Sequence, residues 1–263
     1  MERYILAVIS ALIACTAGRI CGFGGGVIIK PVLDMLGTAS VSEISFISGC
    51  TVLAMSLWSV GKSSIKKDSM LDYKTAVPLG LGAAAGGILG KLAFSYIKGV
   101  FNTEKTAGAV QTAVLFLLVV LTFVYTLNKD KLKSYRLRGI PVCAVAGIVL
   151  GFIGAFLGIG GGPFNMAALF ILFSMNVKEA AENSICIILI SQIFSLLFSL
   201  LSGTVPPTDL KFLAAMIAAG IIGSEAGNRI NKRLSERSVN SLFLAMMILV
   251  MGICIYNMIG FLS

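Results

Sequence analysis

The sequence contains no histidine, and only 13% of its 263 residues are charged, whereas an ordinary globular domain has about 25%. The absence of histidine removes the commonest general base and the commonest neutral metal ligand. It also excludes the serine–histidine arrangement of some intramembrane proteases. We therefore expect no enzyme active site, no metal site and no cofactor.

Cysteine is present but is not arranged for metal or disulfide chemistry. No Cys-x-x-Cys pair occurs, which argues against a zinc site and against a disulfide framework. The cysteines stand singly among apolar residues, at Cys15, Cys21, Cys50, Cys143, Cys186 and Cys254. We interpret them as small packing residues.

Long apolar runs fill most of the chain. Hydrophobic residues make up 57% of the sequence, and eight runs are near or above the roughly 17 to 25 residues that cross a bilayer core. They are Tyr4–Ile20, Ile44–Val60, Thr75–Ile97, Val110–Leu127, Ile140–Leu157, Ser184–Leu201, Phe212–Gly227 and Ser241–Leu262. This pattern predicts an all-α, multi-pass integral protein of the cell membrane. We expect the first run to be a retained helix and not a signal peptide, because it has no A-x-A-like cleavage site.

Two shorter apolar pieces each follow a glycine cluster. Val27–Leu36 comes after "GFGGG" and Pro163–Phe173 comes after "GIGGG". A helix of this length rises about 1.5 Å per residue and reaches about half-way across the hydrocarbon core. We expect each piece to be a short broken helix led by glycine.

The two glycine-led segments belong to an internal repeat. "GFGGGVIIKPVLDML" from Gly22 aligns with "GIGGGPFNMAALFIL" from Gly158. Further aligned pairs are Glu43 with Glu179, Ser48 with Ser184 and, after one inserted residue, Asp72 with Asp209 and Gly86 with Gly223. Two halves of one ancestral unit explain this order better than chance identity among glycine-rich helices. We divide the chain into a first transmembrane repeat (1–128), a basic cytoplasmic linker (129–139) and a second transmembrane repeat (140–263).

The paired glycine segments, each after a first helix and each leading into a short helix with proline, resemble the TauE/SafE sulfite-exporter family. The resemblance covers essentially the whole chain. It implies a transporter that moves sulfite or a small organosulfonate outward, with the proton gradient as a candidate driving force. One departure is that Pro31 lies five residues past its glycine cluster, whereas Pro163 follows its cluster directly.

Basic residues are distributed unevenly among the connections. They concentrate around Lys66, Lys133 and Arg233, and the positive-inside rule assigns these loops to the cytoplasm. The repeat counterpart of the Lys66 loop, "SGTVPPTD", has no basic residue and should face the opposite side. This follows if each half has five segments and the halves are inverted, with the N-terminus outside. Inverted repeats are typical of secondary transporters, whose sites form near the midplane where broken helices meet.

The glycine turns are predicted to bind an anion. A turn that leads into a helix start directs several backbone N–H groups at one point, with the positive end of the helix dipole behind them. We place the anion near the midplane between the two turns, with Pro163 at the first position of its helix. The predicted backbone ligands are Gly22, Gly24, Gly25, Gly26, Gly158, Gly160, Gly161 and Gly162. The alternative is that these glycines let helices pack closely.

Charged and polar side chains complete the predicted site. Arg19 is expected either to face the anion or to bridge a carboxylate such as Glu225. Glu225 is the candidate proton-coupling carboxylate, and a structural ion pair with Arg229 is the alternative. Neutral groups that could orient an oxyanion, or bond between helices, are Asn165, Ser184 and Gln192.

Small residues four apart form a different pattern, which we assign to helix contacts without a ligand role. They are Gly82, Gly86 and Gly90 in the first half, and Ala219, Gly223 and Gly227 in the second.

Together these features predict a secondary transporter for a small anion, and the family resemblance implies that it exports a sulfur oxyanion, either sulfite or an organosulfonate such as sulfoacetate. An anion channel, or a permease for sulfate or a carboxylate, is the alternative. An intramembrane enzyme would need a nucleophile with an activating base, and no such pattern occurs. The expected partners are the anion and the lipid bilayer. Nucleic acid is not expected, because the net charge of +9 suits loops that face anionic headgroups. A homodimer is an assembly that the sequence leaves open.

Overall fold

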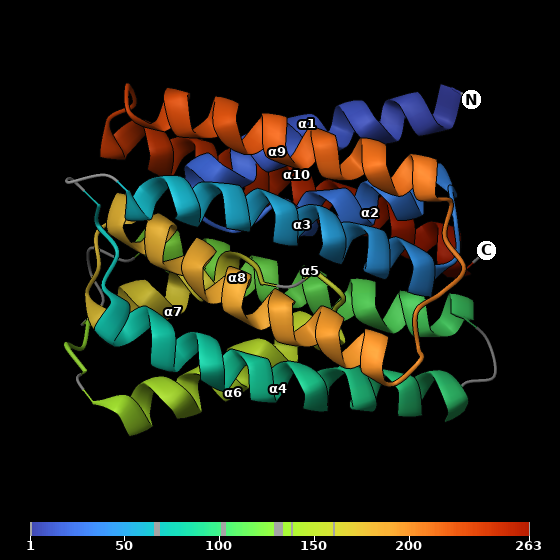
Figure 1. The fold of residues 1–263 in the computed structure, drawn as a ribbon, viewed down its shortest axis with the longest axis horizontal. Coiled ribbons are helices and arrows are strands. Elements are labelled where there is room, and N and C mark those ends of the chain that lie inside the picture. Colours follow the sequence, from blue (N-terminus) through green and yellow to red (C-terminus); the bar gives the residue numbers. More distant parts are fainter. Residues whose placement is uncertain are drawn as a thin grey trace.

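The computed structural model describes residues 2–65, 69–100, 104–128, 134–137, 139–159 and 161–262. All regular structure in these residues is helical (Figure 1). The helices are α1 (Glu2–Cys21), α2 (Gly26–Leu36), α3 (Val41–Ser64), α4 (Tyr73–Val100), α5 (Glu104–Asn128), α6 (Ile140–Phe156), α7 (Pro163–Phe173), α8 (Val177–Leu201), α9 (Leu210–Asn231) and α10 (Glu236–Leu262). The expected all-α membrane architecture is confirmed.

Seven of the described helices are long and apolar enough to cross a membrane. The eighth expected span, α6, has 17 residues and falls short of that set, because the chain turns at Gly158, where φ is +68°. The short apolar helices α2 and α7 have 11 residues each, or about 16 Å at 1.5 Å per residue. They match the two half-length pieces that the sequence predicts.

Aligned residues of the two halves cap equivalent helices. Ser40 accepts a hydrogen bond from the backbone N–H of Glu43 at the start of α3. Asn176 and Glu179 form a capping box at the start of α8. The carboxylates of Asp72 and Asp209 accept from backbone N–H groups two residues on, at the starts of α4 and α9. Such caps satisfy donors that a helix start leaves open, so these aligned pairs share a structural role.

The small-residue faces bring backbones into contact, as the spacing predicts. A side chain at Gly86 of α4 would collide with the backbone carbonyl of Ile148 in α6. A side chain at Gly223 of α9 would lie 2.6 Å from the carbonyl oxygen of Leu12 in α1. The pairs α4–α6 and α9–α1 therefore pack closely without intervening side chains.

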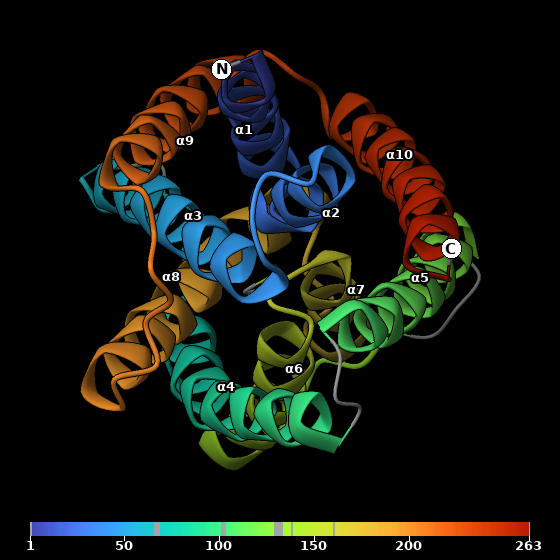
Figure 2. The same ribbon diagram turned by 90° about the vertical axis from the view of Figure 1, so that its right-hand side faces the viewer.

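Helix neighbours follow the same scheme in both halves. α3 packs on α9 as α8 packs on α4, α2 packs on α10 as α7 packs on α5, and α3 and α8 contact each other. Viewed end-on, α2 and α7 lie inside the bundle (Figure 2), and most of their side chains are buried. The half-length helices are therefore enclosed by the longer ones.

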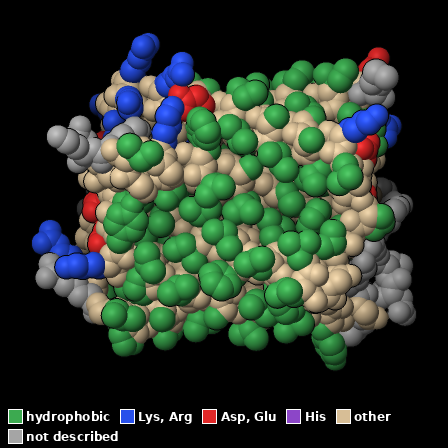
Figure 3. Space-filling view, in the orientation of Figure 1, with side chains coloured by type: hydrophobic (Ala, Val, Ile, Leu, Met, Phe, Trp, Pro, Cys, Tyr) green, Lys and Arg blue, Asp and Glu red, His purple; other side chains and the backbone are tan. Residues whose placement is uncertain are grey.

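The two ends of the bundle differ in charge. The end of α9 and the start of α10 lie at the same end as the end of α3 and the start of α4, and both chain termini lie at the other end (Figure 1). Exposed Arg229, Arg233 and Arg237 belong to that α9–α10 region, and Figure 3 shows basic side chains gathered at this end, with apolar side chains across the middle. The apolar belt is the surface that lipid would cover.

Candidate functional site

The glycine turns adopt backbone conformations that require glycine. Gly22 and Gly24 of the first turn have φ of +77° and +70°, and Gly158 and Gly161 of the second have φ of +68° and +144°. Residues with a side chain rarely adopt these values. Gly160 lies outside the described residues. The predicted irregular backbone before α2 and α7 is therefore present in both halves.

The two turns meet inside the protein. Gly26, at the start of α2, packs against the backbone carbonyl of Ile159 in the second turn. A Cβ atom at Gly24 would lie 3.2 Å from the side chain of Ile188 in α8, and a Cβ atom at Gly161 would lie 2.6 Å from the same side chain. The structure thus brings the glycines of the two halves together, as expected of glycine-led helices that meet.

Little free space remains at the first turn. A side chain at Gly25 would lie 2.7 Å from the sulfur of Cys15, and one at Gly22 would collide with Ala181. A void of about 10 Å³ is lined by Gly161, Asn165 and other residues, and a void of this size holds about one water. Asn165 is buried, and its Oδ1 has no hydrogen-bond partner among the described residues. At the first turn this geometry favours the packing interpretation.

A larger cavity of about 490 Å³ lies next to the second turn. Gly158, Ser191 and Gln192 line it near the middle of the bundle, and Thr204 and Pro206 line it at the α8–α9 connection. Other lining residues are Ser42, Ser45, Phe46, Gly49, Lys91, Leu92, Phe94, Ser95, Gln111, Ala155, Ser195, Leu196, Phe198, Ser199 and Ser202. The cavity therefore extends from the interior toward the end of the bundle that carries the termini.

Lys91 carries a full charge in the wall of this cavity. Its Nζ donates to the carbonyl oxygen of Ser195 and to Oγ of Ser199, both at 2.6 Å. These two partners are neutral, so no carboxylate among the described residues compensates its positive charge. No site was predicted at Lys91 from the sequence. The available signal was a lysine inside a long apolar run, which is itself a mark of function.

Arg19 lies away from this cavity. It is 2% exposed, its Nε donates to Asn228 at 2.7 Å, and one terminal nitrogen lies 3.6 Å from a carboxylate oxygen of Glu182. Arg19 thus bridges a carboxylate, as one of its two expected roles requires, but the partner is Glu182 and not Glu225. The backbone N–H of Met70 donates to the other oxygen of Glu182, so this pair ties α1 and α8 to the start of α4.

Glu225 lies in a network of basic and aromatic donors. One of its oxygens accepts from Lys62 and, at 3.1 Å, from Nε1 of Trp58. The other accepts from Arg229 at 2.8 Å. This is the ion-pair alternative for Glu225, and its proton-coupling role stays a prediction.

The neutral polar candidates separate into two groups. Gln192 lines the large cavity and Asn165 lines the small void. Ser184 is fully buried, and its hydroxyl, like that of its repeat partner Ser48, has no hydrogen-bond partner among the described residues. Ser184 is not in the described lining of either space.

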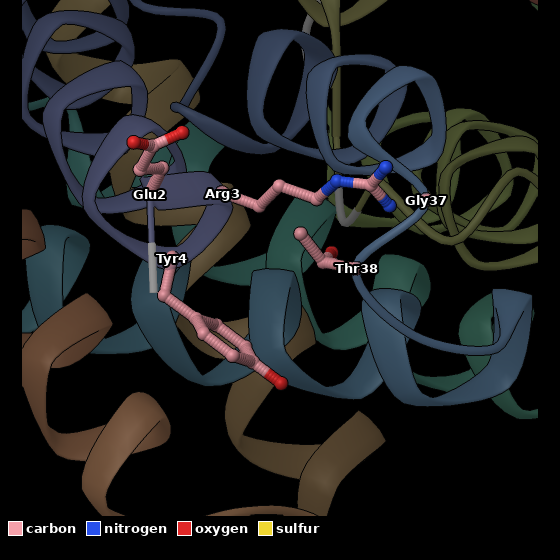
Figure 4. Close-up of a pocket in the computed structure, with 5 residues that line it drawn as sticks. All are labelled: Glu2, Arg3, Tyr4, Gly37 and Thr38. Atoms are coloured by element: carbon pink, nitrogen blue, oxygen red, sulfur yellow. The ribbon is translucent and has the colours of Figure 1, made fainter.

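A second hollow lies between the start of α1 and the end of α2. It measures about 620 Å³ and is lined by Glu2, Arg3, Tyr4, Gly37 and Thr38. Figure 4 shows the Arg3 guanidinium extended toward Gly37, which ends α2, while the Tyr4 ring points away. This hollow belongs to the surface at the termini and is separate from the Lys91 cavity.

These features define a multi-pass helical membrane protein with two half-length helices inside its bundle. The family described as sulfite exporter TauE/SafE matches residues 7–254, and the chain belongs to this family. It is similar to the "Probable membrane transporter protein YunE" of Bacillus subtilis (strain 168), with 24% identity over 270 residues that cover 94% of this chain and 95% of the relative. No solved structure matches the chain. The protein is therefore a membrane transporter and not an enzyme, as the sequence predicted.

Proposed function

We propose that this transporter exports a small sulfur oxyanion, sulfite or an organosulfonate such as sulfoacetate, and that the Lys91 cavity receives the anion. The observation that carries the proposal is the charge of the cavity wall. Of the described lining residues, Lys91 alone bears a full charge. A lysine held by neutral oxygens can exchange them for the oxygens of an anion at little cost in hydrogen bonding.

The remaining lining suits a sulfonate. Hydroxyl and amide donors line the same cavity as Lys91, at Ser191, Gln192 and Ser199, and an anion with several acceptor oxygens can use such donors. Aromatic and aliphatic side chains, among them Phe94 and Leu196, line the same cavity and would accept a short organic tail. These features support an organosulfonate as well as sulfite itself.

The barrier at the glycine turns supports a carrier over a channel. Between the large cavity and the opposite end lie the packed turns, and the void at Gly161 and Asn165 is about 10 Å³. A continuous pore would need a wider passage for a hydrated anion. In the proposed cycle the anion passes from one side of this barrier to the other, and Gly161, Gly162 and the start of α7 bind it in transit.

The proposed inverted relation of the halves is supported by the helix neighbours. The pairs α1–α9 and α6–α4 correspond when each helix of one half is replaced by its counterpart in the other, and so do α2–α10 and α7–α5. In Figure 1, α3 runs from the end with the termini to the basic end, and its counterpart α8 runs the opposite way. Rocking of such halves about a midplane site is how many secondary transporters alternate access.

Transport into proteoliposomes tests the proposal. Purified protein would be assayed with labelled sulfite, sulfoacetate, sulfate and acetate, with and without an imposed pH gradient. Saturable movement of sulfite or sulfoacetate, inhibited by the unlabelled anion, is expected. A preference for sulfate or acetate would favour the alternative permease, and unsaturable flux with a measurable current would favour a channel.

A further inference from the structure

Lys30 and Asp34 form a buried ion pair on the half-length helix α2. Their charged atoms are 3.7 Å apart, and each side chain is 4% exposed. Lys30 Nζ also donates to Oε1 of Gln111 at 2.7 Å. The second carboxylate oxygen of Asp34, Oδ1, is buried and has no hydrogen-bond partner among the described residues. Burying charge at membrane depth is costly, so such groups mark functional sites more often than structural ones.

The ion pair lies directly behind the wall of the Lys91 cavity. Gln111, which holds Lys30, lines that cavity, and its Nε2 donates to the carbonyl oxygen of Phe156 at the end of α6 at 2.6 Å. The Cε atom of Lys30 lies 3.1 Å from where a side chain at Gly158 would begin, and Gly158 is also a lining residue. A single side chain therefore separates the Lys30 ammonium from the space that receives the anion.

We propose that Asp34 is the proton-binding group of this transporter and that its protonation makes Lys30 available to the anion. The inference rests on the proposed function. While Asp34 is ionised, it neutralises Lys30, and among the described lining residues Lys91 is the cation without a carboxylate partner. A proton taken up at Oδ1 makes the carboxyl neutral, and Lys30, still held by Gln111, adds a second positive charge beside the cavity.

Proton and anion then favour each other's binding, so in this proposal they cross the membrane together, and export follows the outward gradient of the anion and is not driven by an inward proton gradient. An anion near Gln111 draws Lys30 away from Asp34, and this increases the tendency of Asp34 to hold a proton. Because coupling between two sites is reciprocal, the proton must raise the affinity for the anion by the same factor. One buried lysine shared by a carboxylate and a substrate is sufficient to link the two equilibria.

Other titratable and charged groups reach the pair from the elements packed on α2. α10 contributes the thiol of Cys254, which is close to both charges. α1 presents Glu2 and Arg3 at the far end of α2, around Gly37 (Figure 4). α3 carries Glu43 in its first turn and Lys62 in its last turn, and α5 contributes the uncharged Gln111. Of these neighbours, Cys254 and Gln111 lie beside the charged atoms of the pair.

Glu225 is the rival proton carrier, and its surroundings are less suitable. Both of its oxygens are occupied by donors, from Lys62 and Trp58 on one side and Arg229 on the other. Taking up a proton at Glu225 would weaken its contacts with three donors, whereas Asp34 would lose one charged contact, to Lys30, and its Oδ1 has no hydrogen-bond partner among the described residues. This difference favours Asp34.

Proton uptake on anion binding tests the inference. Purified transporter in weakly buffered detergent solution would be mixed with methanesulfonate, which keeps its charge from mildly acidic to mildly alkaline pH, while an indicator dye records protons and calorimetry records affinity. The wild-type protein should take up as much as about one proton per anion and bind more weakly as pH rises. Compared at mildly acidic pH, so that the Lys91 amine itself stays protonated, Asp34→Asn should take up no proton and bind with an affinity that does not depend on pH. The exposed-carboxylate control Glu236→Gln should behave as wild type.

Further variants keep the outcome decisive. If Asp34→Asn does not fold because Lys30 is left buried and unpaired, the neutral double variant Lys30→Gln/Asp34→Asn should fold, lose proton uptake and lose the pH dependence of any binding that remains. Proton uptake that persists in the folded Asp34 variant, or that is lost in Glu225→Gln, would overturn the inference. If the wild-type protein binds neither methanesulfonate nor sulfite, the proposed function fails and this inference with it. Binding without proton uptake by the wild-type protein overturns the inference alone.

Discussion

The cationic side chains at the basic end of the bundle and the lysine in the large cavity have different kinds of partner. At the basic end Lys62 and Arg229 contact Glu225, and Arg19 contacts Glu182. In the cavity Lys91 contacts a carbonyl and a hydroxyl. A cation paired with a carboxylate is already neutralised, so an incoming anion must displace a charged partner. A cation held by neutral oxygens still attracts an anion at full strength. Partner chemistry therefore separates structural cations from a binding cation.

Removing the cavity lysine gives the sharpest test of that difference. We expect Lys91→Met to weaken anion binding by at least about 30-fold, because truncating a charge that binds a ligand typically costs about 2 to 5 kcal/mol. The matched variant Lys62→Met, at the basic end, should change the affinity by less than about twofold, because exposed ion pairs contribute little. Calorimetry with sulfite and methanesulfonate measures both. Similar losses of affinity in the two variants would contradict the distinction between a binding cation in the cavity and structural cations at the basic end.

Breaking the Arg19–Glu182 pair should affect stability more than binding. We expect Glu182→Gln to lower the free energy of unfolding by about 2 kcal/mol, less than the loss for a fully buried pair because Glu182 is 19% exposed on its side chain. Arg19 then remains buried with only neutral partners. Thermal unfolding in detergent and anion affinity would be measured together. A large loss of affinity without a loss of stability would place Arg19 at the substrate, the other role predicted for it.

The two glycine turns extend the comparison to the backbone. Gly25→Ala introduces a side chain against Cys15, and we expect a loss of about 1 to 2 kcal/mol in stability with unchanged affinity. Gly161→Ala narrows the void beside Asn165, and we expect about tenfold weaker binding or slower transport, since backbone must approach the ligand there. Gly61, where a side chain would meet nothing within 4 Å, supplies the control substitution to alanine. Equal losses of affinity in Gly25→Ala and Gly161→Ala would support the predicted binding site shared by the two turns.

The smallest expected effect is at Glu225. Glu225→Gln should lower the free energy of unfolding by less than about 1 kcal/mol, because Lys62 and Arg229 are 43% and 79% exposed on their side chains and regain water. Substrate exchange in proteoliposomes should be retained, and its response to a pH gradient should also be retained. Loss of that response alone would make Glu225 the coupling carboxylate, as the sequence first suggested.

The sequence predicts the helices well because the bilayer imposes their lengths. Apolar runs, two half-length pieces and the repeated glycines were sufficient for the order of the helices, including the bounds of α7. The α6 span was overestimated because hydropathy continues through Leu157, whereas the helix ends where Gly158 adopts its left-handed conformation. Composition does not record that conformation.

The side-chain partners could not be predicted in the same way. Arg19 and Glu225 are both charged residues in apolar runs, and their pairing was a reasonable expectation, yet each pairs with another residue. Which helices adjoin is decided by packing between segments more than 100 positions apart, and a single sequence has no signal for it. For Lys91 the sequence shows only that a lysine lies inside a long apolar run, and its place in the cavity that α3, α4 and α8 enclose could not be predicted.

The backbone contacts of α4 with α6 and of α9 with α1 have a mechanical consequence. Gly86 meets the carbonyl of Ile148, and Gly223 meets the carbonyl of Leu12. At these points no flexible side chain lies between the two backbones, so neither helix can slide along the other unless the two first separate. Each pair therefore behaves as one rigid two-helix unit. Helices can slide more easily at interfaces with longer, deformable side chains. One such interface has Gln192 and Leu196 of α8 against Gly49 of α3. Sliding is therefore expected at the α3–α8 interface and not within the α4–α6 or α9–α1 pair.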